Sequence, residues 1–183
     1  NSAGNRTGTP ETYCRDCYKV LNMENQNAYL VITGKYLLTQ DSNQTIIENG
    51  GIVIVDDQIL ETGDGQTLLN KYPGSEHIVE EHGLVMPGLV NTHTHAAMSC
   101  FRGIADDLPL MQWLQEYIFP VEAKLTPDIV YHSTLLSICE MIKSGTTSFC
   151  DMYLFAADVA RAADKAGMRA WIGEVLYDFP SPN

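Results

Sequence analysis

The sequence has few basic residues. Eleven lysines and arginines stand against 23 aspartates and glutamates, so the 183 residues carry a formal net charge of -12. A surface that binds nucleic acid or an anionic membrane needs clustered lysine and arginine. The composition therefore argues against both kinds of partner, and we interpret the acidic excess as a solvated face that aids solubility.

Two further features are missing, a disulfide framework and a long apolar run. Five cysteines are an odd number, and the sequence contains neither an export-type apolar segment near its start nor the roughly 18 consecutive apolar residues of a membrane helix. We therefore predict a cytoplasmic protein with reduced thiols. The motif Cys14-Arg-Asp-Cys17 lacks a second close pair of ligands, which argues against a structural zinc site there.

The first part of the chain predicts a small β module. Residues 1–22 are polar, lack periodicity and precede Met23, so we interpret them as a leader or cloning-derived segment that is expected to be disordered. Residues 23–83 form the next predicted domain, in which short β runs are separated by turns. The predicted strands are Tyr29–Thr33, Tyr36–Leu38, Thr45–Ile47, Gly51–Val55, Gln58–Glu61 and His77–Glu81, and a short helix is predicted over Gln66–Tyr72.

Residues 84–183 change to an alternation of strands and helices. An apolar run over 84–90 predicts a buried parallel strand, and a helix is expected from near Pro109, capped by Asp106 or Asp107 and ended by Pro120. Further predicted elements are a helix from Thr126-Pro127 to Lys143, a strand over Thr146–Tyr153, a helix over Ala156–Ala166 and a strand over Met168–Tyr177. This order is typical of a parallel α/β sheet. A closed (β/α)8 barrel needs eight strands and only three are visible, so we predict an incomplete barrel in an N-terminal fragment or truncated gene product.

His93 and His95 end the first predicted strand of this part. Alternate residues of a strand point to the same face, and their Cα atoms lie about 6.6 Å apart. Two imidazoles in that arrangement can bind one metal ion, with zinc well suited and iron acceptable. A pair of polar residues facing solvent is the plain alternative, but the position at the carboxyl end of a barrel-type strand favours a metal site.

The residues around this pair resemble the amidohydrolase superfamily. The resemblance extends to the branch that holds 5-methylthioadenosine and S-adenosylhomocysteine deaminases, with the triazine chlorohydrolases as near relatives. It is carried by Met86-Pro-Gly-Leu-Val-Asn-Thr-His-Thr-His95, Arg102-Gly-Ile-Ala-Asp-Asp-Leu-Pro109, Trp113-Leu114, Phe119-Pro-Val-Glu122, Ser144-Gly-Thr-Thr147 and Asp151-Met-Tyr153. It implies the first three strands of a TIM-like (β/α)8 barrel, preceded by part of a small β-sandwich.

The same resemblance implies hydrolytic deamination of an adenosine-type nucleoside in the full-length protein, which would release ammonia. It implies one divalent metal ion, Zn2+ with Fe2+ as the alternative, held by His93 and His95, and a homo-oligomer when full length. The further metal ligands and the general acid and base are expected beyond Asn183. Trp113 matches an aromatic that packs near the purine, and Glu122 matches a carboxylate that contacts ribose hydroxyls.

Several readings stay open at this point. The enzyme could be another hydrolase of the branch, such as a chlorohydrolase or a guanine or other nucleobase deaminase, or the chain could be an inactive fragment. Trp113 could be ordinary helix packing. Asp151 could orient a metal-bound histidine or cap the following helix, whereas His77, His82 and His132 are interpreted as structural or solvated.

Overall fold

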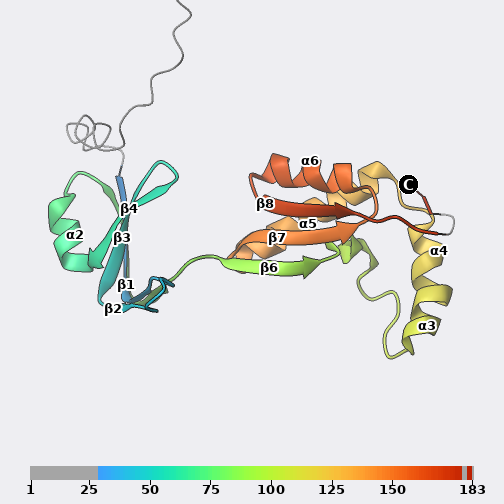
Figure 1. The fold of residues 1–183 in the computed structure, drawn as a ribbon, viewed down its shortest axis with the longest axis horizontal. Coiled ribbons are helices and arrows are strands. Elements are labelled where there is room, and N and C mark those ends of the chain that lie inside the picture. Colours follow the sequence, from blue (N-terminus) through green and yellow to red (C-terminus); the bar gives the residue numbers. More distant parts are fainter. Residues whose placement is uncertain (1–28, 179–180, 183) are drawn as a thin grey trace, which may run out of the picture. The chain divides into compact units, whose positions relative to one another are not determined.

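A computed structural model describes residues 29–178 and 181–182. The predictions for residues 1–22 lie outside this range. The chain is a mixed α/β protein that divides between Pro87 and Gly88 into two compact units, four residues after the predicted domain boundary. Each unit is described by itself (Figure 1).

The first unit is a five-stranded sheet with one helix. Its central strand, β1, pairs antiparallel with β2 and β3 and parallel with β5, while β4 lies outside β3. The elements are β1 Tyr29–Leu38, β2 Ile46–Glu48, β3 Gly50–Val55, β4 Gln58–Asp64, α2 Gly65–Lys71 and β5 Glu76–Val85. Val31, Val53 and Leu68 form its buried core. The two strands predicted at Tyr29–Thr33 and Tyr36–Leu38 are one strand, because a register shift between Gly34 and Tyr36 accommodates the interruption.

The second unit is a three-stranded parallel sheet in the order β6-β7-β8. Helices α5 and α6 pack against it (Figure 1), and Val130, Ile138, Phe149 and Val159 are among the fully buried side chains of the core. The elements are β6 Leu89–Thr94, the 3-10 helix η1 Ala96–Phe101, α3 Leu110–Gln112, the π-helix η2 Trp113–Ile118, α4 Phe119–Glu122, α5 Pro127–Lys143, β7 Thr146–Tyr153, α6 Ala156–Ala166 and β8 Arg169–Glu174.

The predicted buried strand over residues 84–90 is wrong. Leu84 and Val85 end β5 in the first unit, and β6 begins only at Leu89. Leu89 and Val90 are 50% and 61% exposed. Strand β6 lies at an edge of its sheet, and an apolar run alone does not tell whether anything covers the strand that it forms.

The helical segment before α5 also differs from its prediction. Neither Asp106 nor Asp107 caps it, since Pro109 occupies the N-cap position and no side chain donates or accepts there. Pro120 does not end it. The segment passes through the π-helix η2 and continues to Glu122, because Pro120 falls in the first turn of α4, where a helix needs no N–H.

The remaining helix ends follow the sequence closely. Thr126 accepts a hydrogen bond from the Ile129 amide at 3.3 Å and Pro127 opens α5, as predicted. Gly145 and Gly167 follow their helices with φ of +83° and +67°, the left-handed conformation that glycine adopts most easily. Among the described helices, none has both the length and the apolar character that a membrane crossing requires.

Candidate metal and substrate site

His93 and His95 lie at the carboxyl end of β6 with their rings side by side. The ring centroids are 5.0 Å apart and the planes are inclined by 77°. His93 is exposed and His95 is half-buried. The local sequence produces this arrangement because His93 is the penultimate residue of β6, whereas His95 is the N-cap residue of η1 and leaves the strand.

The ring of His95 is oriented by β7. Its Nδ1 lies 2.6 Å from the carbonyl oxygen of Met152. A carbonyl oxygen can only accept, so Nδ1 carries the proton and donates it, which leaves the lone pair on Nε2. This tautomer is the one in which an imidazole can bind a metal ion through Nε2.

Asp151 holds the turn that carries His95. Its Oδ1 accepts hydrogen bonds from the Thr94 hydroxyl at 2.6 Å and from the Ala96 amide at 2.7 Å. Its side chain therefore binds the first amide of η1, which follows β6. The alternative in which it caps α6 is wrong, because Phe155 is the N-cap residue of α6 and makes no side-chain cap hydrogen bond. Asp151 is 1% exposed, and its Oδ2 has no hydrogen-bond partner among the described residues. Burial raises the pKa of this carboxyl, against the lowering effect of the two hydrogen bonds and of His95 and His93.

The side chains at this end of β6 supply some of the ligands that one divalent metal ion needs. Two imidazole rings lie 5.0 Å apart, and His95 has its Nδ1 bound to a carbonyl so that Nε2 is the nitrogen available to a metal. Nitrogen donors of this kind suit zinc or iron. Within residues 29–178 and 181–182, no group of three or more histidine, cysteine, aspartate and glutamate side chains is arranged to hold a metal. The described residues thus provide two ligands of a site that needs more.

Glu122 is joined to this site through Tyr153, the last residue of β7. The Tyr153 hydroxyl donates to Glu122 Oε1 at 2.7 Å, and its ring centroid lies 5.9 Å from that of His95. Tyr153 is 4% exposed. Burial raises the pKa of its phenol and the Glu122 carboxylate raises it further, so the hydroxyl remains a proton donor. Sequence reasoning missed this role of Tyr153, although the motif Asp151-Met-Tyr153 contains the residue.

Trp113 is not brought into this group. It opens η2 and is half-buried, and no hydrogen bond or ring contact within the described part of the chain joins it to His93, His95 or Glu122. The other histidines are also elsewhere. His77 contacts the Tyr72 carbonyl and Ser75, and His132 is exposed with Nδ1 2.8 Å from the Asp128 carbonyl of its own helix.

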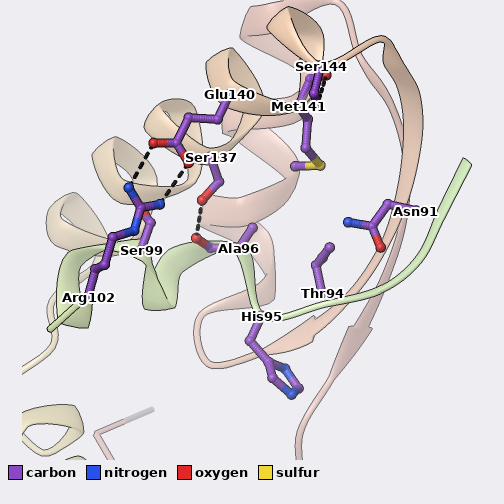
Figure 2. Close-up of a pocket in the computed structure, with 10 residues that line it drawn as sticks. All are labelled: Asn91, Thr94, His95, Ala96, Ser99, Arg102, Ser137, Glu140, Met141 and Ser144. Atoms are coloured by element: carbon purple, nitrogen blue, oxygen red, sulfur yellow. Dashed lines mark hydrogen bonds and ion pairs between the residues drawn. The ribbon is translucent and has the colours of Figure 1, made fainter. Parts of the chain in front are cut away.

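A depression lined by residues of β6, η1 and α5 has His95 at its edge (Figure 2). Arg102 and Glu140 pair across it through two hydrogen bonds of 2.9 and 2.7 Å, and Ser137 donates to the Ala96 carbonyl at 2.6 Å. The ring of His95 points away from these groups. Because the charged side chains of the depression pair with each other and its serine hydroxyls donate to backbone carbonyls, we locate the candidate chemistry at the histidine pair.

Comparison with known proteins agrees with this geometry. The family model "Amidohydrolase family" matches residues 84–182, and the chain belongs to this family. A curated relative from Syntrophus aciditrophicus, named 5-methylthioadenosine/S-adenosylhomocysteine deaminase 1, is 51% identical over 159 residues, which cover 86% of this chain and 36% of that protein. The chain therefore spans about a third of the length of the curated relatives it matches.

Solved structures give the same result. An adenosine deaminase from Xanthomonas campestris with bound zinc superposes with a TM-score of 0.78 at 35% identity, over 84% of this chain and 35% of that one. A guanine deaminase from C. acetobutylicum with bound guanine superposes with a TM-score of 0.69 at 28% identity, over 83% of this chain and 38% of that one. The resemblance to the amidohydrolases and to their deaminase branch is thereby confirmed.

Proposed function

We propose that this chain forms the first part of a metal-dependent hydrolase that deaminates an adenosine-type nucleoside, 5-methylthioadenosine or S-adenosylhomocysteine, and releases ammonia. The observation that carries the proposal is the pair of adjacent imidazoles at the end of β6, with His95 fixed in the tautomer that binds metal. The deaminase name of the relative at 51% identity supports the substrate class.

In this proposal the three parallel strands are the first three of a TIM-like (β/α)8 barrel, and the first unit is part of a small β-sandwich. Strands β6 and β7 end at the histidines and at Tyr153, which is the end of the strands where barrel enzymes carry their chemistry. The described residues of the first unit form a single sheet, so the second layer of a sandwich would have to come from other residues.

The residues divide into metal ligands and substrate contacts. His93 and His95 would bind Zn2+, with Fe2+ as the alternative, and the ion when bound supplies Lewis-acid activation of water. Glu122 would accept hydrogen bonds from two ribose hydroxyls, because a charged acceptor makes the stronger bonds. Trp113 would pack near the purine, a role that rests on the resemblance alone.

The substrate class is tested with the complete gene product loaded with zinc. We expect ammonia release from 5-methylthioadenosine and S-adenosylhomocysteine to exceed release from guanine by a wide margin, with no chloride released from a chlorotriazine. A preference for guanine or for the chlorotriazine would assign the protein to another activity of the family, and inactivity on all four would refute the enzyme proposal.

The metal site is tested by replacing its ligands. His93→Ala and His95→Ala in the complete gene product should each lower bound zinc and activity by more than the 10–100-fold typical of residues that only support a ligand. His132→Ala is the matched control, since that imidazole binds its own helix, and it should change neither. In the 183-residue chain, zinc should bind weakly and a chelator should strip it easily; unchanged zinc content in the two ligand variants would exclude them as ligands.

The role of Glu122 is tested by Glu122→Gln. The amide keeps the shape of the side chain but loses the charge that strengthens hydrogen bonds to ribose. KM should rise for nucleosides more than for the free base, with kcat little changed. An equal rise for both substrates would remove Glu122 from ribose binding.

A further inference from the structure

Three consecutive residues at the end of β7 each fix a different part of the site. Asp151 holds the turn at His95 through Thr94 and Ala96, the Met152 carbonyl accepts from His95 Nδ1, and the Tyr153 hydroxyl donates to Glu122. The first two act on the histidine pair. Tyr153 acts on a different element, because Glu122 ends α4, far from β7 in the sequence.

The contact between Tyr153 and Glu122 constrains both side chains. Tyr153 is almost fully buried, so water cannot satisfy its hydroxyl, and a buried hydroxyl without a partner is strongly unfavourable. The bond therefore holds the phenol in place and, with it, the carboxylate that accepts from it. A glutamate side chain otherwise has many rotamers, and ordering them on ligand binding weakens affinity.

The geometry of the pair leaves part of the carboxylate free. Tyr153 uses Oε1, and no other hydrogen bond to the carboxylate is found among the described residues. A carboxylate has about four acceptor sites on its two oxygens. Glu122 is half-buried, so Oε2 and the second lone pair of Oε1 can accept from a ligand while Tyr153 keeps its bond.

We propose that Tyr153 is a positioning residue that fixes the Glu122 carboxylate for the vicinal hydroxyls of a ribose. The proposal rests on the proposed function, because it takes Glu122 as the ribose contact. Tyr153 itself does not touch substrate. Tyr153 and the Met152 carbonyl, which binds His95, lie at the same end of β7. This strand end therefore fixes the position of the sugar contact relative to the metal ligands.

The test is Tyr153→Phe in the zinc-loaded complete gene product, which removes one oxygen and keeps the buried ring. We expect KM for the nucleoside to rise about tenfold, because the Glu122 side chain must then be ordered when the ligand binds, with KM for the free base and kcat changed less than twofold. Tyr131→Phe is the matched control. Tyr131 is half-buried and packs against the same core, and its ring stacks with Arg161 at 4.8 Å.

A double variant separates positioning from general packing. If Tyr153 acts through Glu122, Tyr153→Phe should add less than twofold to the nucleoside KM in a Glu122→Gln background. A full tenfold further rise, or an equal effect on nucleoside and free base, would overturn the positioning role. If the wild-type protein distinguishes nucleoside from base and Tyr153→Phe leaves that distinction intact, only the positioning role fails. If the wild type neither binds nor deaminates nucleosides, the proposed function fails and the positioning role fails with it.

Discussion

The carboxyl group of Asp151 combines deep burial with two strong donors on one oxygen. The Thr94 hydroxyl and Ala96 amide bind Oδ1, while Oδ2 is buried without a partner among the described residues. The bonds to Oδ1 stabilise the turn at His95, but burial of the charge opposes them and raises the pKa of the carboxyl. The residue therefore couples the turn at the proposed metal site to pH.

This coupling gives a pH prediction with a definite sign. Because the pKa of Asp151 is higher in the folded chain than in the unfolded chain, the folded state binds the proton more tightly. Tighter proton binding stabilises the folded chain at low pH. This stabilisation of the folded chain is lost as pH rises from the ordinary aspartate pKa through the raised one. Each unit of difference between the folded and unfolded pKa values changes the free energy of unfolding by about 1.4 kcal/mol.

Asp151→Asn isolates the effect, since the amide has the same shape and does not ionise. With chelator present, urea unfolding of both chains from about pH 4, near the ordinary aspartate pKa, upward should show the stability of the wild type falling relative to Asp151→Asn as pH rises. The exposed carboxylates are common to both chains and cancel. A difference that stays constant or grows in favour of the wild type would contradict the raised pKa.

Strand β6 depends on the close approach of Gly88 to β7. A Cβ atom built at Gly88 would lie 2.1 Å from Cγ2 and 2.4 Å from Oγ1 of Thr147. These distances are far shorter than van der Waals contact, so a side chain at this position requires Thr147 or the strand to shift where β6 and β7 begin to pair. This contact explains the glycine of the Met86-Pro-Gly motif.

Gly88→Ala should therefore destabilise the second unit by about 1–3 kcal/mol, the usual effect of overpacking. Thr147→Ala removes the two nearest atoms and leaves Cβ at 2.8 Å, so the double variant should recover part of the loss. Chemical denaturation of the four chains measures both effects. A Gly88→Ala chain as stable as the wild type would show that the strands separate easily here.

The molecule as a whole combines a high negative charge with an uncovered apolar face. Val90, Met152 and Trp171 are 61%, 46% and 61% exposed, and strand register places them on one face of the β6-β7-β8 sheet. Exposed apolar faces of this kind favour association. The net charge of -12 opposes it by mutual repulsion, which salt screens.

We therefore expect the 183-residue chain to self-associate, and more strongly as ionic strength rises. Sedimentation velocity at two salt concentrations measures this. Val90→Thr and Trp171→Gln should reduce association, whereas Ile59→Thr, a change at a 64% exposed residue of the first unit, should leave it unchanged. A monomer under all conditions, or association that salt weakens, would contradict the prediction.

Local signals in the sequence were sufficient for much of the second unit. The bounds of α5, β7 and α6 match their predictions, because Thr126-Pro127, Gly145 and Gly167 control the chain within a few residues. The exposure of β6 and the passage of the helical segment through Pro120 were not predicted, since both depend on what surrounds them. The spacing of the two histidines places them close together in the chain, but the orientation of His95 depends on Asp151 and Met152 of β7, because His95 lies beyond the end of β6.

The amino-acid order alone was enough to indicate the family, the alternation of strands and helices and the histidine pair, because each depends on residues close together in the chain. Only the tertiary structure brought Asp151, Met152 and Tyr153 to His95 and Glu122. These contacts join residues 31 to 57 positions apart, and which pairs meet at such separations is decided by strand order and register. Local propensity contains no information about either.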